Sequence, residues 1–277
     1  MDAVPAQRTR PPRVRPVAPA DVSPGFAPLA VAVLALAVPL MIVLIVVAAV
    51  IPTVPWWAGV LVALAVAGLA VWQRLRSAHD VVVEELLTNR GSVSSVRLTN
   101  MVHSLALVVG VEEPEAFVLD TDAVNALIAA RNDVATLFVT RGLDERLEPV
   151  ELEAVVAELL VRLRSGDAEA ATIGAALYRL RLLGPLSNFT IGRTASLGLA
   201  TLLADERDLA ADQQAVALTR YPPALSSALS KVKDQPRRPA DLGGECDLLW
   251  LVSPDPAAAP GATRSPLDLR IDVLTEL

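Results

Sequence analysis

The stretch ELEAVVAELLVRLRSGD, residues 151–167, carries a clear helical pattern in the second half of the chain. Pro149 stands just before it, and proline is favoured in the first turn of a helix because it has no N–H to donate. Apolar side chains recur at the spacing of one helix face, at Leu152, Val155, Val156, Leu159, Leu160 and Leu163. The pattern therefore predicts a helix that begins at Pro149 and buries this face in a core.

The polar side chains of this helix fall on the opposite face, at Glu151, Glu158, Arg162 and Ser165. Glu158 precedes Arg162 by one helical turn, which is the favourable order for an ion pair within a helix. Two interpretations stay open from the pattern. These side chains form either a solvated surface or part of a buried ion cluster.

The segments around this helix predict one domain of helices and short strands. SVSSVRLTNMVHSLALVVG has helical spacing and ends at Gly110, while EAFVLD, VATLFVT and LLWLV (248–252) are typical of short strands. Further helices are expected at 168–182, 204–219, 222–233 and 265–276. The predicted fold class is α+β, mainly helical.

Upstream, residues 22–73 contain no charged side chain. Water-soluble helices need a polar face, so this run favours a membrane location. Two apolar segments follow one another: 29–51 is long enough to cross about 30 Å of hydrocarbon, and 56–72 is at the short end of the spanning range. Pro52 and Pro55 separate them, and tryptophans lie at the ends of the second. We expect a transmembrane hairpin over 29–73.

Arginines flank this hairpin on both outer sides and are absent from its turn: Arg8, Arg10, Arg13, Arg15, Arg74 and Arg76. The positive-inside rule then puts both termini and the main domain in the cytoplasm, at the cell's inner (plasma) membrane. Residues 1–28, rich in proline, are expected to be a disordered basic tail, and 74–277 the cytoplasmic domain. Arginines at 179, 181 and 193 interrupt the apolar region 171–204, so we expect amphipathic helices there rather than spans.

The charge and cysteine content narrow the possible functions. The net charge of −7 argues against nucleic-acid binding. The single cysteine, Cys246, cannot form an internal disulfide, which suits a cytoplasmic domain.

Several blocks, in order, resemble the HtpX-type membrane zinc metalloproteases over roughly residues 75–277 and the preceding hairpin. They are LTNMVHSLALVVGVEEPEAFVLD, VNALIAARNDVATLFVTRGLDERL, ELEAVVAELLVRLRSGD, ERDLAADQQAVALTRYPPALSSALSKV, LLWLVSP and TRSPLDLRIDVL. The resemblance implies a zincin-like, peptidase-like domain. It also implies a zinc site on an H-E-x-x-H helix, in which two histidines bind the metal and the glutamate activates water.

Aligned on that family pattern, the chain departs from it at each central position. Glu158 stands at the first histidine, Leu159 at the glutamate, Arg162 at the second histidine, Asp208 at the third ligand and Arg264 at a closing histidine, while Asp212 keeps a supporting aspartate. Leucine cannot accept a proton, and arginine brings a fixed positive charge to the place of the metal. The two histidines of the chain, His79 and His103, lie outside the motif.

These departures predict no catalytic residues of the family type, no zinc and no other cofactor. We expect instead a Glu158–Arg162–Asp208 cluster at the former metal site, the guanidinium standing in for the metal's charge. A less favoured interpretation is a hard cation such as Mg²⁺ held by Glu158, Asp208 and Asp212, with Asp167 beside them. Arg162 argues against it.

The sequence thus predicts an inactive, membrane-anchored peptidase homologue, a pseudoenzyme that binds rather than cuts. Its partners would be the lipid bilayer and a membrane protein or an active protease that it regulates or scaffolds, or an extended peptide along the strand at 135–140. The alternative is an active membrane metallopeptidase with a non-standard metal site. A third class is a structural protein whose hairpin packs on a partner through Gly59, Ala63 and Ala67.

Overall fold

The computed structural model describes residues 56–88, 91–178, 205–240, 246–254 and 265–277. The predicted tail 1–28 and first span 29–51 lie outside the described residues, as do most of 171–204 beyond Tyr178 and the position of Arg264.

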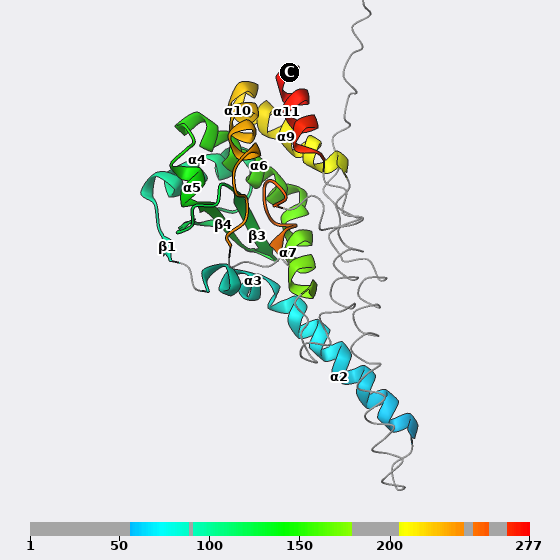
Figure 1. Ribbon diagram of the computed structural model, residues 1–277. Helices are drawn as coiled ribbons and strands as arrows, with labels where there is room; N and C mark the ends of the chain where they lie inside the picture. Colours follow the sequence, from blue (N-terminus) through cyan, green and yellow to red (C-terminus); the bar gives the residue numbers. More distant parts are fainter. Residues whose placement is uncertain (1–55, 89–90, 179–204, 241–245, 255–264) are drawn as a thin grey trace, which may run out of the picture.

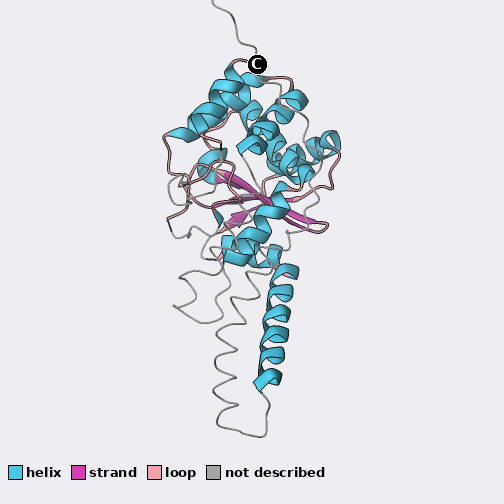
Figure 2. Cartoon of the chain, turned by 90° about the vertical axis from the view of Figure 1, so that its right-hand side faces the viewer, coloured by secondary structure: helices cyan, strands magenta, loops and turns pink. Residues whose placement is uncertain are grey.

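The order of elements mixes helices with a short run of strands (Figures 1 and 2). They are α2 (Trp56–Arg76), α3 (Ala78–Leu87), β1 (Ser92–Val93), α4 (Val96–Val109), β2 (Glu115–Leu119), β3 (Ala126–Arg131), β4 (Val134–Thr140), α5 (Arg141–Asp144), α6 (Pro149–Ser165), α7 (Asp167–Tyr178), α9 (Asp205–Thr219), α10 (Pro222–Lys233) and α11 (Leu267–Thr275). The mainly helical α+β class is confirmed, and so are α4, β2, β4 and the start of α6 at Pro149.

The four described strands form one mixed sheet in the order β1-β2-β4-β3. β2 pairs parallel with β4, and β3 pairs antiparallel with the other side of β4. β4 is therefore an interior strand with both edges occupied. The prediction that an extended peptide lies along 135–140 is wrong, because strand addition requires a free edge.

Helices cover both faces of the sheet, and side chains alternate between two cores (Figure 1). On one face, Ile128, Leu137 and Val139 pack with α4, α6 and α10. On the other, Leu127 and Phe138 pack with α3, α7 and residues 246–250. The sheet is thus buried on both sides, so its strands carry apolar runs instead of a clean polar alternation.

α6 is the central helix of the domain. It contacts α4, α7, α9, α10 and β3, and residues 154–162 are all buried, on every side of the helix. Gly166, with φ of 81°, ends the helix in the left-handed conformation that glycine adopts readily. The solvated-face interpretation of Glu151, Glu158 and Arg162 is wrong, because all three side chains are buried.

The strand predicted at 248–252 is not formed as a ladder. A single antiparallel bridge joins Trp250 to Leu127 of β3, and Leu251 N donates to Ala126 O at 2.7 Å. The next pairing is made by the side chain of Asn125, which accepts from Val252 N at 3.2 Å and donates to Val252 O at 2.7 Å. The amide side chain of Asn125 therefore makes the two hydrogen bonds to Val252 that a neighbouring strand residue would make with its backbone. We call residues 246–254 the closing segment.

α2 contains the second predicted span. No single helix within the described part of the chain is long and apolar enough to cross a membrane, but the bent pair Val60–Arg76 and Ala78–Leu87, with 62° between its halves, passes by length and composition. Large apolar side chains on α2 are exposed, among them Trp57, Leu61 and Leu69. Trp72 stacks with Arg76, whose Cζ lies 4.6 Å from the ring centroid.

The last turn of α2 and the start of α3 are tied to the domain by polar contacts. Arg131 Nε donates to Leu75 O at 3.1 Å, His79 Nε2 lies 3.0 Å from Thr136 Oγ1, and Arg74 Nε donates to Ala176 O at 3.4 Å. The junction between helix and sheet is thus built from specific hydrogen bonds.

Candidate functional site

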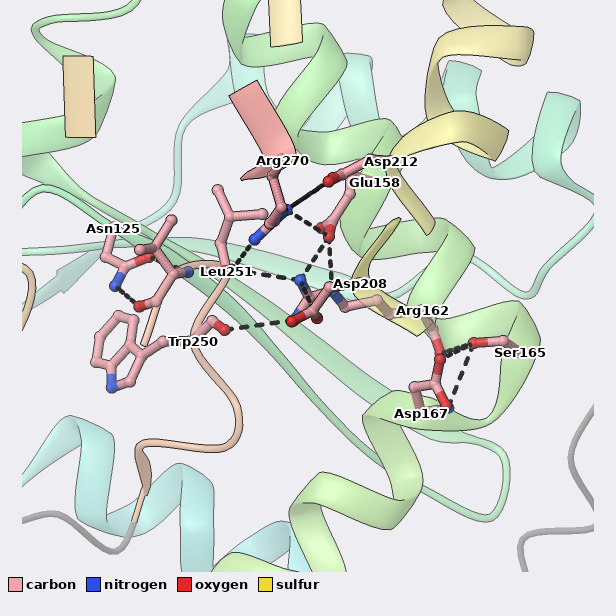
Figure 3. A network of polar contacts seen from close by, with 11 residues as sticks. Asn125, Glu158, Arg162, Ser165, Asp167, Asp208, Asp212, Trp250, Leu251 and Arg270 are labelled. Atoms are coloured by element: carbon pink, nitrogen blue, oxygen red, sulfur yellow. Dashed lines mark hydrogen bonds and ion pairs between the residues drawn. The ribbon is translucent and has the colours of Figure 1, made fainter. Parts of the chain in front are cut away.

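Five charged side chains meet beside α6, at its interface with α9 and α11 (Figure 3). They are Glu158 and Arg162 from α6, Asp208 and Asp212 from α9, and Arg270 from α11. We call this group the ion cluster. Four of the five are almost fully buried, with exposed fractions of 0 % for Glu158, 6 % for Arg162, 1 % for Asp212 and 2 % for Arg270.

Arg162 lies between two acids and the closing segment. Its Nε and Nη2 contact Glu158 Oε1 at 2.7 and 2.6 Å, and Nη2 lies 3.2 Å from Asp208 Oδ1. The guanidinium also donates to the carbonyl oxygens of Trp250 and Leu251, each at 3.3 Å. The predicted Glu158–Arg162–Asp208 cluster is confirmed.

Arg270 forms the second centre of the cluster. Its Nε and Nη2 bind both carboxylate oxygens of Asp212 at 2.7 Å, the two-point geometry that suits a guanidinium. Nη1 donates to Leu251 O at 2.9 Å, and Nη2 reaches Glu158 Oε1 at 3.3 Å. Glu158 therefore joins the two arginines, and Leu251 O accepts from both.

The electrostatics of Glu158 are unusual for a carboxyl group flanked by arginines. Oε1 receives the guanidinium contacts, whereas Oε2 is buried with no hydrogen-bond partner among the described residues. Burial raises the pKa of Glu158, the charges of Arg162 and Arg270 oppose this, and the neighbouring aspartates reinforce it. Three acids and two arginines carry a net −1 when all are ionised, so one proton on Glu158 makes the cluster neutral.

Both guanidiniums stay positively charged. Burial acts to lower the pKa of Arg162, but Glu158 and Asp208 outweigh it and leave that pKa raised. For Arg270 burial also lowers the pKa, and the close pair with Asp212 outweighs it in turn. The charges of the cluster are thus held in place by one another. Removing one member leaves the buried charge of its partner uncompensated.

Glu158, Asp208 and Asp212, the acids considered above as cation ligands, are each paired with an arginine. No group of three or more His, Cys, Asp or Glu side chains in the described ranges is arranged to hold a metal ion. Asp167 lies apart from the other acids and accepts a hydrogen bond from Ser165 Oγ at 2.8 Å (Figure 3). His103 pairs with Glu113 on the exposed face of α4, and His79 contacts Thr136 at the α3 junction.

Sequence reasoning missed Arg270 and the carbonyl groups of the closing segment. A signal for Arg270 was present, because Leu267, Arg270 and Leu274 share the spacing of one helix face and Leu274 is buried. An arginine in the apolar face of a short helix indicates a buried acidic partner. Leu159, aligned with the family's catalytic glutamate, is fully buried in the core beside the sheet.

Comparison with known proteins gives distant relatives of one kind. The chain is 29 % identical over 210 residues to a protease HtpX homolog of Tropheryma whipplei (strain Twist), covering 65 % of this chain and 72 % of the relative. It is 29 % identical over 227 residues to a protease HtpX homolog of Levilactobacillus brevis, covering 67 % of this chain and 74 % of the relative.

A third protease HtpX homolog, from Dictyoglomus thermophilum, is 29 % identical over 163 residues, and the match spans about half of that relative, 53 %. No family model matches the chain. The mixed sheet with α6 packed on one face is consistent with a zincin-like domain. The chain is a distant homologue of the HtpX protease homologues.

Proposed function

We propose that this chain is a membrane-anchored, non-hydrolysing homologue of HtpX-type metalloendopeptidases that acts as a binding, regulatory or scaffolding protein. The observation that carries the proposal is the ion cluster. The carboxylates of Glu158, Asp208 and Asp212 form ion pairs with Arg162 and Arg270. The oxygen atoms that a metal would need are therefore bound to guanidinium groups.

The correspondence with the family supports the same conclusion. In the aligned motif Glu158 and Arg162 take the places of the two histidines, and Leu159 takes that of the general base. A fixed cation at the second position repels a divalent metal by Coulomb's law, most strongly where water is excluded. Leu159, being apolar and buried, offers no oxygen to activate a water molecule.

The membrane part of the proposal is a two-span hairpin, 29–51 and 56–72, with both termini and the domain in the cytoplasm. The charge-free run 22–73, the arginines that flank it and the exposed apolar side chains of α2 support it. Residues 1–28 then form a basic tail near the anionic membrane face. A membrane protein or an active protease is the expected partner, and the chain's net charge of −7 does not favour nucleic acid.

The test is metal content of the full-length protein purified in detergent, measured by mass spectrometry together with cleavage of an unfolded client protein. We expect fewer than about one zinc per ten chains, in a protein that still unfolds cooperatively. The matched comparison is a variant with Glu158→His, Leu159→Glu and Arg162→His, which restores the family motif on the same helix.

The outcomes separate the alternatives. Little metal and no cleavage by the native chain, with metal gained by the triple variant, supports a lost catalytic site on a retained scaffold. About one metal per native chain, lost on Asp208→Ala, would refute the proposal and favour an active metallopeptidase with a rebuilt site.

A further inference from the structure

α2 has two faces of opposite character. One face carries large apolar side chains with exposed fractions of 48–59 % and ends at an exposed arginine: Val62, Val66, Leu69, Trp72 and Arg76. These positions are three or four residues apart, so they form one continuous line along the helix. We call this line the α2 stripe.

The opposite face of α2 is turned toward the domain. Ala67 and Val71, one turn apart, are each 2 % exposed. Arg74 lies on the same face and donates from Nε to Ala176 O of α7 at 3.4 Å. Away from its contacts with α3 and α7, the helix projects beyond the domain (Figure 1). The part of the chain that the structure describes therefore leaves the α2 stripe uncovered.

The size of the side chains distinguishes lipid from another helix as the occupant of the α2 stripe. Helices inside a membrane pack closely through small residues, because lipid tails are as apolar as leucine and large apolar side chains gain little by leaving them. The small residues Gly59, Ala63 and Ala67 follow a different line along α2. The α2 stripe therefore suits acyl chains better than a neighbouring helix.

The end of the α2 stripe nearest the domain holds a cation in position. Arg76 Cζ lies 4.6 Å from the ring centroid of Trp72, a cation–π contact that orders the guanidinium. Stacking uses the flat face of the guanidinium and leaves its N–H groups free in the plane, where a phosphate accepts them in pairs. Among the described residues no carboxylate pairs with Arg76. An anion is thus the missing partner at this end.

The length of the α2 stripe matches one leaflet of a bilayer. From Val62 to Arg76 the helix rises by about 21 Å, at about 1.5 Å per residue. A bilayer with its headgroups is about 40–45 Å thick, so one leaflet measures roughly 20–22 Å. With Arg76 among the headgroups, Trp72 lies at the interface, where tryptophan is preferred.

We propose that the α2 stripe binds an anionic phospholipid of the cytoplasmic leaflet, with the phosphate on Arg76 and an acyl chain along the apolar side chains from Leu69 to Val62. The proposal rests on the membrane hairpin of the proposed function and adds the lipid partner of α2 and the level of the headgroups. An anionic headgroup is favoured because the ammonium group of a zwitterionic one repels the arginine. The 62° bend between α2 and α3 then lies at the membrane surface, and α3, which packs on the sheet, belongs to the domain.

The first experiment measures lipid binding to the full-length protein in detergent by native mass spectrometry, with phosphatidylglycerol and phosphatidylcholine added in turn. We expect phosphatidylglycerol to bind more tightly, and Arg76→Gln to weaken its binding about fivefold, the effect of one arginine at an anionic surface. Trp72→Leu keeps the stripe apolar but removes the stacking, so it should weaken binding by about two- to fivefold. Arg97→Gln, at an exposed position of α4, is the matched control and should leave binding unchanged.

The second experiment locates the α2 stripe in lipid nanodiscs with nitroxide labels read by electron paramagnetic resonance. Labels at Leu69→Cys and Ala67→Cys are compared, with the buried Cys246 replaced by alanine in both. The label at position 69 should be relaxed by oxygen, which concentrates in hydrocarbon, and not by a water-soluble nickel chelate. The label at position 67, on the face turned toward the domain, should be shielded from both reagents.

The two experiments separate failure of the lipid site from failure of membrane anchoring. A label at position 69 that the nickel chelate relaxes would put α2 in water and overturn both proposals. A label there that is shielded from both reagents would indicate a protein occupant, the segment 29–51 or a second copy of the chain, and overturn the lipid site alone. Equal binding of the two lipids, or binding of phosphatidylglycerol that Arg76→Gln leaves unchanged, would also overturn the lipid site alone.

Discussion

Replacing Arg162 with methionine should destabilise the domain strongly, because the side chain is the main partner of a fully buried acid. The substitution keeps the apolar stem and removes two contacts to Glu158, one to Asp208 and two to backbone carbonyl groups. Glu158 would keep only the contact with Arg270 at 3.3 Å. Removing one partner of a buried ion pair lowers the free energy of unfolding by about 3–5 kcal/mol.

The measurement is thermal unfolding of the full-length protein in detergent, followed by circular dichroism. Because about 1 kcal/mol shifts the melting temperature of a domain this size by roughly 2–4 °C, Arg162→Met should lower it by about 6–20 °C. The same change at the exposed Arg97 should alter the free energy of unfolding by less than about 0.5 kcal/mol.

A double-mutant cycle distinguishes a coupled cluster from independent contributions. Once Arg162 is methionine, Glu158→Gln removes a buried charge that keeps only the 3.3 Å contact with Arg270, so it should destabilise far less than in the native background or even stabilise. We expect an interaction energy between the two sites of about 1–3 kcal/mol. A loss below about 1 kcal/mol for Arg162→Met, or strictly additive effects, would refute the reasoning, since exposed ion pairs behave in that way.

Two further predictions concern other parts of the domain. Burial acts to raise the pKa of Glu151, but hydrogen bonds from two side chains and a backbone N–H outweigh it, so the folded pKa lies below the ordinary 4.5. The ionised Glu151 therefore stabilises the folded domain at pH values above about 4.5, and this stabilisation is lost as the pH falls through the folded pKa. In urea unfolding measured at a series of pH values, Glu151→Gln should reduce the fall of the midpoint concentration at acid pH. A Cβ at Gly142 would meet the backbone carbonyl oxygens of Asp122 and Ala123, so Gly142→Ala should cost about 1–3 kcal/mol by thermal unfolding. Gly91→Ala, where a Cβ makes ordinary contact, should be close to neutral, and equal losses at both glycines would contradict the clash.

Local pattern was sufficient for the elements with a single buried face or a clear terminal signal. α4 ends at Gly110, whose φ of 78° suits glycine, and α6 begins at Pro149. β3 was missed because ALIAAR is buried on both faces and carries no period of two. The strand at 248–252 was over-predicted for the opposite reason. Its composition favours a strand, yet only one bridge forms, and Asn125 takes the place of further ladder pairing.

The site divides along similar lines. The pair of Glu158 and Arg162 follows from helical spacing, and Asp208 followed only from the family resemblance. That these side chains are buried could not be read from α6, because the covering comes from α9 and from Arg270 of α11, which are distant in sequence. Arg270 depends on the same tertiary arrangement, although its place among the apolar positions of α11 was a usable signal.

The hydrogen bonds at the base of α2 give the molecule a mechanical property. Arg131 donates to Leu75 O, and His79 contacts Thr136. The end of α2 and the start of α3 are therefore mechanically coupled to the sheet. α2 has 21 residues, a length of about 30 Å, so a tilt of about 10° at its base moves the far end by roughly 5 Å. A tilt of α2 would then be passed to the sheet through these hydrogen bonds, across the 62° bend between α2 and α3.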